Sequence, residues 1–221
     1  MRPMEQVVQD GAREIYQVEQ SAVVEKPVYQ AVKRLFDVVV SALALLILGI
    51  PMLLLMPVIR ADSPGPAIFR QERLGKGGKP FVIYKYRTMQ MDAERDGPQW
   101  ARAHDVRCTK LGRLLRRGHI DELPQLVNVL RGEMSLVGPR PERACFYQEF
   151  ERYIRGFSQR LQVKPGITGW AQINGLRGDT DIAERIRYDI WYIENWTVAL
   201  DIKILFRTVF GGKMVNDEKI Q

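Results

Sequence analysis

Two adjacent carboxylates, Asp121 and Glu122, are the side chains of this sequence best placed to do chemistry. Leu123 and Pro124 follow them, and because proline is tolerated in the first turn of a helix, the pair is predicted at a helix N-terminus. One interpretation is structural: Asp121 caps the helix and Glu122 complements its dipole. The other is chemical, and the surrounding residues favour it.

Arginines flank the pair on both sides, with Arg113, Arg116 and Arg117 upstream and Arg131 and Arg140 downstream. A guanidinium group binds phosphate oxygens bidentately, so such a cluster suits an anionic phosphate. Mg²⁺ needs only one or two carboxylates when substrate phosphates complete its coordination shell. A carboxylate that cations keep ionised can also attack phosphorus. The cluster therefore predicts a site for Mg²⁺ and a phosphorylated substrate.

Other candidate sites match their templates less well. Zinc sites have paired, closely spaced ligands, and the scatter of His104, Cys108, His119 and Cys145 does not fit that pattern. The run 75–79 is rich in glycine and lysine but lacks the Lys-Ser/Thr ending of a phosphate-binding loop, so we predict a turn. The sequence contains no serine-hydrolase, metalloprotease or dinucleotide-binding motif.

The composition narrows the class of protein. The chain has 221 residues, 46% of them apolar and 27% charged, which suits one folded domain with appendages rather than a disordered chain. Two cysteines indicate a reducing compartment. The net charge of +7 predicts an anionic partner, but the cations are spread along the chain and no nucleic-acid motif is present. We therefore expect no nucleic acid among the partners.

Among the elements that must position this site, the most prominent is an uncharged apolar run from Val38 to Ile59. As one helix it would be about 33 Å long, enough to cross a bilayer core of about 30 Å. Pro51 near its middle predicts a kink, and cations flank both ends, a pattern that favours the cytoplasmic side at each end. Three interpretations remain open from the residues alone: a re-entrant hairpin, a kinked transmembrane span and a buried core helix. A mean hydropathy of −0.21 excludes a polytopic membrane protein.

The remaining pattern predicts an α+β, mostly helical fold with a small β-hairpin. Strands are expected over 67–72 and 81–87, and helices over 123–130, 144–157, 182–196 and 198–210, while 111–117 is a short basic segment. The last helix has one apolar side that suits either a membrane interface or the core. Residues 1–30 lack the pattern of a secretory signal and are predicted to form a frayed or partly helical arm.

Several long segments follow one another in an order typical of one enzyme family: KRLFDVVVSALALLILGIP (33–51), GPAIFRQERLG (65–75), YKYRTM (84–89), TKLGRLLRRGHIDELPQLVNVLRGEMSLVGPRPE (109–142), VKPGITGWAQINGLRGDT (163–180) and YDIWYIENWTVALDIKIL (188–205). On these segments the chain, from about Lys33 to Phe210, resembles the bacterial sugar transferase family. Its members are monotopic polyprenyl-phosphate phosphoglycosyl transferases.

The resemblance implies transfer of a sugar-1-phosphate from a UDP-sugar to a polyprenyl (undecaprenyl) phosphate, with release of UMP. It implies a ping-pong route through an aspartyl-phosphosugar, with Asp121 as nucleophile and Glu122 as Mg²⁺ ligand. It places phosphate or nucleotide contacts at Arg116, Arg140 and Arg177. Leu176 stands where family members often have that last arginine. Further substrate-binding residues implied by the matching motifs are Lys85, Arg87, Pro139 and Gln172.

The resemblance also implies how the chain is organised. We expect an N-terminal arm (1–30), a re-entrant membrane helix broken at Pro51 (31–60) and a catalytic domain with amphipathic interfacial helices (61–221). That domain would lie on the cytoplasmic face of the bacterial plasma membrane, in contact with membrane lipid. The segment 178–196 is more like members that transfer a hexose phosphate, glucose or galactose, in the first membrane step of polysaccharide assembly. We allow for a homodimer.

Two alternatives remain beside this enzyme. A non-catalytic membrane scaffold of a polysaccharide assembly complex would bind its partners without turnover, with Asp121 and Glu122 serving only as capping residues. A soluble nucleic-acid binder would bury the apolar run in its core. The complete set of carboxylates and arginines argues against the first alternative, and the absence of a nucleic-acid motif argues against the second.

Overall fold

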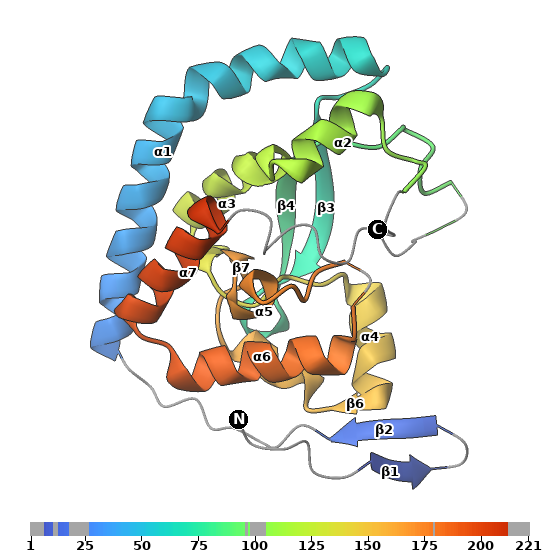
Figure 1. Ribbon diagram of the computed structural model, residues 1–221, viewed down its shortest axis with the longest axis vertical. Coiled ribbons are helices and arrows are strands. Elements are labelled where there is room, and N and C mark those ends of the chain that lie inside the picture. The colour runs from blue at the N-terminus through green and yellow to red at the C-terminus, as the bar shows by residue number, and fades with distance from the viewer. Residues whose placement is uncertain are drawn as a thin grey trace.

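The computed structural model describes residues 7–10, 13–17, 27–95, 97, 105–178 and 180–211. Over these residues the fold is mostly helical with three small sheets, as expected for an α+β chain (Figure 1). The sheets pair β1 (Val7–Asp10), β2 (Arg13–Gln17) and β6 (Ile154–Arg155); β3 (Ile68–Leu74) and β4 (Pro80–Tyr86); and β5 (Ser135–Val137) and β7 (Gly166–Thr168). The helices are α1 (Pro27–Asp62), α2 (Lys110–Arg117), α3 (Leu126–Arg131), α4 (Ala144–Tyr153), α5 (Trp170–Ile173), α6 (Ile182–Asn195) and α7 (Val198–Phe210), and the 3₁₀ turns are η1 (Lys76–Gly78), η2 (Ile120–Gln125) and η3 (Phe157–Gln162).

The predicted β-hairpin is confirmed. β3 and β4 pair antiparallel from Ile68 opposite Tyr86 to Leu74 opposite Pro80. The connecting run 75–79 forms the predicted turn, and Gly77 and Gly78 adopt positive φ angles of 67° and 72°, which favour glycine. The hairpin matters for the site because β4 carries Lys85 and packs against η2, where the two carboxylates lie.

The apolar run forms most of α1, a helix of 36 residues that continues through Pro51 and Pro57. The expected break at Pro51 is therefore absent, because the helix is continuous through this residue. The helix as a whole is bent: Figure 1 shows α1 rising beside the other elements and then turning across them. A straight helix of this length would carry its ends about 54 Å apart. Because of the bend, both ends of α1 contact the same body.

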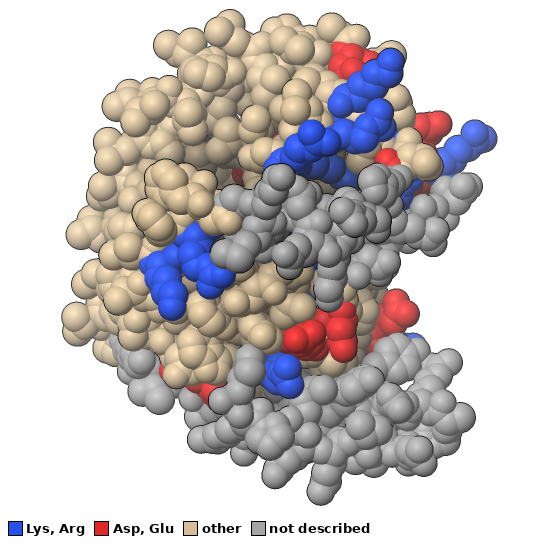
Figure 2. Space-filling view, viewed as in Figure 1, with Lys and Arg blue, Asp and Glu red and all other residues tan. Residues whose placement is uncertain are grey.

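Most of the apolar surface of α1 is exposed. Its most apolar stretch of 18 residues is only 6% buried. Figure 2 shows this surface free of charged side chains over most of its length. The core-helix interpretation is therefore wrong, and α1 is long and apolar enough to cross a membrane. The exposed apolar side chains include those of Leu43, Leu46, Ile47, Ile50, Leu53 and Leu54.

Buried polar contacts fasten the first half of α1 to the rest of the fold. Lys33 Nζ lies 2.6 Å from Asp201 Oδ2 in α7, and Tyr29 Oη donates to the same oxygen over 3.0 Å. Arg34 donates to the carbonyl oxygens of Val129 and Leu130, which end α3. These contacts orient α1 against α3, the helix that directly follows the two carboxylates.

The second half of α1 has its own contacts. Tyr86 Oη at the end of β4 donates to the carbonyl oxygen of Met52 over 2.7 Å. Ile59 is buried against Ala67, Tyr86 and Leu115. The hairpin and α2 therefore lie beneath the end of α1, and the segment that carries the carboxylates follows α2 directly.

We expect Asp201→Asn to lower the free energy of unfolding by about 3–5 kcal/mol, because it leaves the buried Lys33 ammonium without a counter-ion. Thermal unfolding in detergent micelles measures the change. The control is the double variant Lys33→Met/Asp201→Asn, which removes both charges and should recover most of the loss. A single variant as stable as the wild type would show that this ion pair does not hold α1.

Two sequence predictions need correction or refinement. The N-terminal arm is not helical over residues 7–10 and 13–17, which form the β1–β2 hairpin, and the other residues of the arm before Pro27 lie outside the described residues. For α7, burial bears out the core interpretation in part, and contact with a membrane interface stays a prediction. Asp201 and Ile204 are buried, whereas Ile202, Phe206, Val209 and Phe210 form an exposed apolar side.

Candidate active site

Asp121 and Glu122 lie in η2, a 3₁₀ turn that leads into α3. The residue before this turn, His119, occupies the N-cap position, and no side chain caps it. The structural interpretation, in which Asp121 caps a helix, is therefore wrong, although both carboxylates do lie in the first turn of η2. Each residue is only 8% exposed. Two carboxylates held this close together in a buried segment need partners or a function.

Glu122 has cationic partners. Its Oε1 lies 2.8 Å from Lys85 Nζ on β4 and 2.7 Å from Arg140 Nη2 in the loop after β5. Burial alone would raise the pKa of Glu122, but Arg140 and Lys85 outweigh it and hold that pKa well below its usual range. In return, Glu122 raises the pKa of Arg140. Glu122 is thus a permanent anion between two cations.

Asp121 is in the opposite situation. Within the described residues its carboxylate accepts no hydrogen bond, and burial together with the adjacent Glu122 raises its pKa to about 6. Lys85, Arg116 and Arg140 act in the other direction. Above that pH the carboxylate is ionised, and no donor in the described part of the chain competes for its lone pairs. A carboxylate in this state suits nucleophilic attack.

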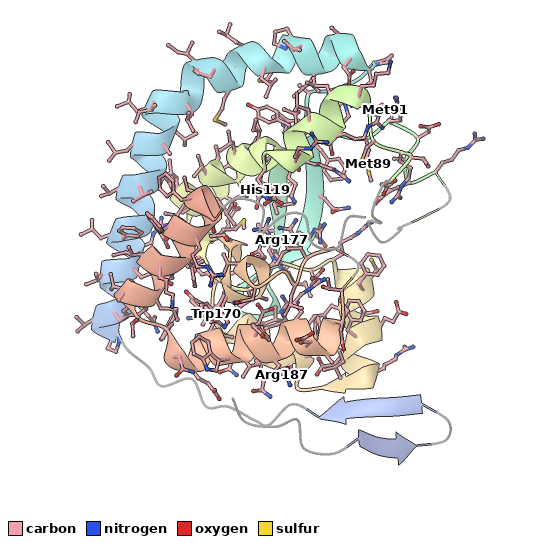
Figure 3. All side chains as sticks on the ribbon, in the orientation of Figure 1. Met89, Met91, His119, Trp170, Arg177 and Arg187 are labelled. Carbon is pink, nitrogen blue, oxygen red and sulfur yellow. The ribbon has the colours of Figure 1, made fainter. Side chains whose placement is uncertain are left out.

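Two further arginines border the carboxylates. Arg116, at the end of α2, donates through Nε to Thr88 Oγ1 over 2.8 Å. Arg177 donates through Nε to the carbonyl oxygen of Gln172, and its Nη1 lies 2.8 Å from His119 Nε2. Figure 3 shows His119 and Arg177 near each other at the centre of the fold. Burial and the nearby Arg140 lower the pKa of Arg177 to about 10.

The other predicted substrate contacts have different positions. Pro139 contributes a carbonyl oxygen that accepts from the Gly166 amide, so it fixes the loop that carries Arg140. Gln172 is buried in α5, where its side-chain Nε2 donates to the carbonyl oxygen of Ile167. Its main-chain carbonyl oxygen accepts the hydrogen bond from Arg177 Nε. Both positions support the arginines around the carboxylates.

Within the part of the chain that the structure describes, no contact joins Arg87 to Asp121 or Glu122. Its guanidinium group is buried at the end of the hairpin, where it donates to Ser63 Oγ and to the carbonyl oxygens of Ser63, Pro64 and Pro66. These bonds fix the turn that follows α1. The contact of Arg87 with a substrate therefore remains a prediction, and its geometry supports a structural role.

Sequence reasoning missed a buried ion network behind the site. Arg160 Nη2 donates to the carbonyl oxygen of Arg140 over 2.8 Å and lies 2.6 Å from Asp189 Oδ2. Glu142 lies 3.6 Å from Arg160 and 3.4 Å from Arg185. The network holds the backbone of Arg140 in place. Its signal in the sequence was Arg185 and Asp189, which share the buried face of the helix predicted over 182–196.

The donor set for a metal ion consists of the two adjacent carboxylates. Among the described residues no group of three or more His, Cys, Asp or Glu side chains is placed to hold an ion. Oxygen ligands from one or two carboxylates suit Mg²⁺ if a substrate supplies the remaining ligands as phosphate oxygens. The residues present therefore fit a metal ion that binds together with its substrate.

Comparison with known proteins identifies the kind of protein that carries this site. Residues 28–213 match the family described as bacterial sugar transferase. A relative from Caulobacter vibrioides is 50% identical over 184 residues, covering 80% of this chain and 68% of the relative. Another from Klebsiella pneumoniae is 46% identical over 184 residues, covering 81% of this chain and 40% of the relative. Both are named UDP-glucose:undecaprenyl-phosphate glucose-1-phosphate transferase.

Other relatives differ in length and in name. An uncharacterized sugar transferase, EpsL of Bacillus subtilis, is 44% identical over 189 residues, covering 86% of this chain and 90% of the relative. The chain spans only about two fifths of the length of the relatives from Klebsiella pneumoniae and Escherichia coli. The matched region nevertheless includes α1, the hairpin, both carboxylates and every arginine described above. This chain belongs to the bacterial sugar transferase family.

Proposed function

We propose that this protein transfers a sugar-1-phosphate from a UDP-sugar to a polyprenyl phosphate and releases UMP. The observation that carries the proposal is the contrast between the two carboxylates: Glu122 is paired with Lys85 and Arg140, whereas Asp121 accepts no hydrogen bond from the described residues. A nucleophile needs free lone pairs, and a phosphate needs cations beside it. Here the two requirements are met by adjacent residues.

In the proposed reaction, an Asp121 oxygen attacks the phosphorus that bears the sugar. The bond between that phosphorus and the oxygen that bridges the two phosphates breaks, and the electron pair leaves with UMP. A phosphate oxygen of the polyprenyl phosphate then attacks the same phosphorus and releases the Asp121 carboxylate. Atoms and charge balance without a further reactant. Two steps also mean that the soluble donor and the lipid acceptor need not occupy the site together.

The cations have separate roles in this scheme. Arg140 and Lys85 neutralise Glu122 and lie beside the position of the transferred phosphate, while Arg116 and Arg177 border it. Phosphoryl transfer depends mainly on positioning and charge stabilisation, which fixed guanidinium groups supply. Mg²⁺, held by Glu122 and substrate oxygens, would neutralise further charge on the leaving phosphate.

For the transferred sugar, the proposal names a class rather than one compound. The relatives from Caulobacter and Klebsiella are named for glucose-1-phosphate, but one from Aeromonas hydrophila, 42% identical over 185 residues, is named for N-acetylgalactosamine. The segment 178–196 supports a hexose. We propose a hexose phosphate, glucose or galactose, as the transferred group.

We further propose that α1 enters and leaves the membrane on the cytoplasmic face. Support comes from its bend, its exposed apolar surface and the contacts of both its ends with one body. Figure 2 also shows lysine and arginine side chains gathered over α2 and α7, where they would meet acidic lipid headgroups. The exposed cations of α2 are Lys110, Arg113 and Arg117.

A cysteine-labelling experiment tests this topology. In a Cys145→Ser background, Val28→Cys and Asp62→Cys place exposed thiols near the two ends of α1, and Cys108 is buried. An impermeant maleimide added to sealed vesicles of known orientation should label both positions from the same side. The exposed wild-type Cys145 reports the side on which the catalytic domain lies. Labelling of positions 28 and 62 from opposite sides would show a transmembrane span.

The reaction is tested by UMP release in detergent with Mg²⁺, polyprenyl phosphate and UDP-glucose, UDP-galactose and their acetamido forms. We expect one sugar to be preferred and chelation of the metal to stop release. If the protein releases no UMP with any of these sugars but still binds other polysaccharide-assembly proteins, the result supports the scaffold alternative.

A further inference from the structure

His119 has a backbone conformation that is unfavourable for its residue type. Its φ of 53° makes it the only non-glycine residue with a positive φ among the residues that the structure describes. In the left-handed conformation the Cβ atom of an L-amino acid lies too close to the following carbonyl oxygen, which makes this conformation unfavourable. Such a residue persists where its surroundings hold it, often at a functional site. Its place at the N-cap of η2 is two residues before Asp121.

The conformation places the His119 ring against Arg177, which lies 58 positions later in the chain. The distance between Arg177 Nη1 and His119 Nε2 is 2.8 Å. A guanidinium group can only donate, so a ring nitrogen of His119 accepts, and Nε2 is nearer to Arg177 Nη1 than Nδ1, which lies 3.4 Å away. The contact thus joins the turn that carries the carboxylates to the loop that follows α5.

Arg177 needs such an anchor because of its neighbours. Arg140 carries a like charge close enough to disfavour the Arg177 cation, and burial disfavours it further. Two acceptors oppose these effects, His119 Nε2 and the carbonyl oxygen of Gln172, 3.2 Å from Arg177 Nε. The Nη2 group of Arg177 makes no hydrogen bond within the described part of the chain, so its donors remain for an anion.

We propose that His119 is a positioning residue that holds Arg177 so that its Nη2 group meets the diphosphate of the nucleotide sugar beside Arg140. The inference rests on the proposed function and adds to it a residue that sets the affinity for the donor substrate. His119 does not touch the reacting phosphorus. Its removal should therefore act on substrate binding through Arg177 more than on turnover.

A double-mutant cycle tests the pair. His119→Gly tolerates the left-handed backbone but lacks the acceptor, and Arg177→Met removes the guanidinium group at similar length. We expect His119→Gly to raise the KM for the UDP-sugar about tenfold, the usual effect of losing a hydrogen bond to a charged group, with kcat changed less than about threefold. The double variant should match Arg177→Met alone, because the two residues act through one contact.

Two controls separate positioning from structure. His119→Gln carries an oxygen acceptor at about the reach of Nε2 and should recover most of the lost affinity. Arg187→Met removes an arginine from α6, apart from the His119–Arg177 pair in Figure 3, and should leave the KM unchanged. Melting temperatures of all variants show whether a loss of activity reflects unfolding.

The outcomes distinguish this inference from the proposed function. Additive effects of His119→Gly and Arg177→Met, or a His119→Gly KM equal to that of the wild type, overturn the positioning role while leaving the reaction intact. Calorimetric binding of UDP provides a readout without turnover. If the wild type releases no UMP with any UDP-sugar yet binds UDP about tenfold more tightly than His119→Gly, the proposed reaction fails and the positioning role stands. Equal UDP affinities in that case overturn both.

Discussion

Asp121→Asn should reduce UMP release at least about 10⁴-fold, because an amide cannot form the covalent phosphosugar of the proposed two-step reaction. The substitution preserves shape, and no hydrogen bond to the Asp121 carboxylate within the described residues is lost. Asp92→Asn, at an exposed position, is the matched control and should retain full activity. Mass spectrometry of the wild type incubated with a UDP-sugar alone should show the added phosphosugar on the peptide that contains Asp121.

The same variant should be more stable than the wild type. Because the pKa of Asp121 rises from 3.8 to about 6 on folding, its contribution to stability is present below pH 4 and is lost as the pH rises through 6. At pH 7 the ionised carboxylate therefore costs on the order of 2–3 kcal/mol, which asparagine avoids. The gap in melting temperature between Asp121→Asn and the wild type should widen from pH 4 to pH 7. A less stable variant at pH 7 would contradict this account of the site.

Glu122→Gln should have the next largest effect. It removes the shared anion between Lys85 Nζ and Arg140 Nη2, 2.8 and 2.7 Å from Oε1, and leaves two cations facing each other. We expect kcat/KM to fall about a hundredfold or more and the Mg²⁺ concentration for half-maximal activity to rise, since an anionic ligand has been lost.

Two comparisons make the Glu122 experiment specific. Glu184→Gln neutralises an exposed carboxylate on α6 and should leave activity and Mg²⁺ dependence unchanged. A Glu122→Gln variant with reduced activity but an unaltered Mg²⁺ dependence would assign Glu122 to holding Lys85 and Arg140 and would remove it as a metal ligand.

The elements predicted well from the sequence are those with strong local patterns. Alternating apolar residues and a glycine-rich turn indicated β3 and β4, and uninterrupted apolar character indicated α1. Helical spacing located α6 and α7 to within a few residues, whereas α2 was seen in the sequence only as a short basic segment. The predicted helix over 144–157 was too long, because after Tyr153 the chain forms β6 and then η3.

The sequence named the residues of the candidate site, whose functional roles stay predictions, but it did not indicate their geometry. The position of Asp121 and Glu122 next to Pro124 indicated a helix start, and the structure has a 3₁₀ turn with both carboxylates near its beginning. The partners of Glu122 come from β4 and from the loop after β5, so only the tertiary fold brings them together. The spacing of apolar residues along the chain does not indicate such contacts.

The same limit applies to the network behind Arg140 and to the contact of His119 with Arg177. Arg160 and Asp189 lie 29 positions apart and His119 and Arg177 lie 58 apart. A charged residue on the buried face of an amphipathic helix was the available clue for Asp189. For His119 nothing local in the sequence indicated a left-handed backbone.

The contacts of α1 also bear on how this protein can be prepared for study. A shortened chain beginning after Asp62 would lose Lys33, Arg34 and Asp37 together with the apolar segment. Asp201, the Leu136 amide and the last carbonyl groups of α3 would then lack their partners in α1. We therefore expect a chain without α1 to be less stable than the full chain, so that the apolar helix and the fold that carries the site have to be prepared together.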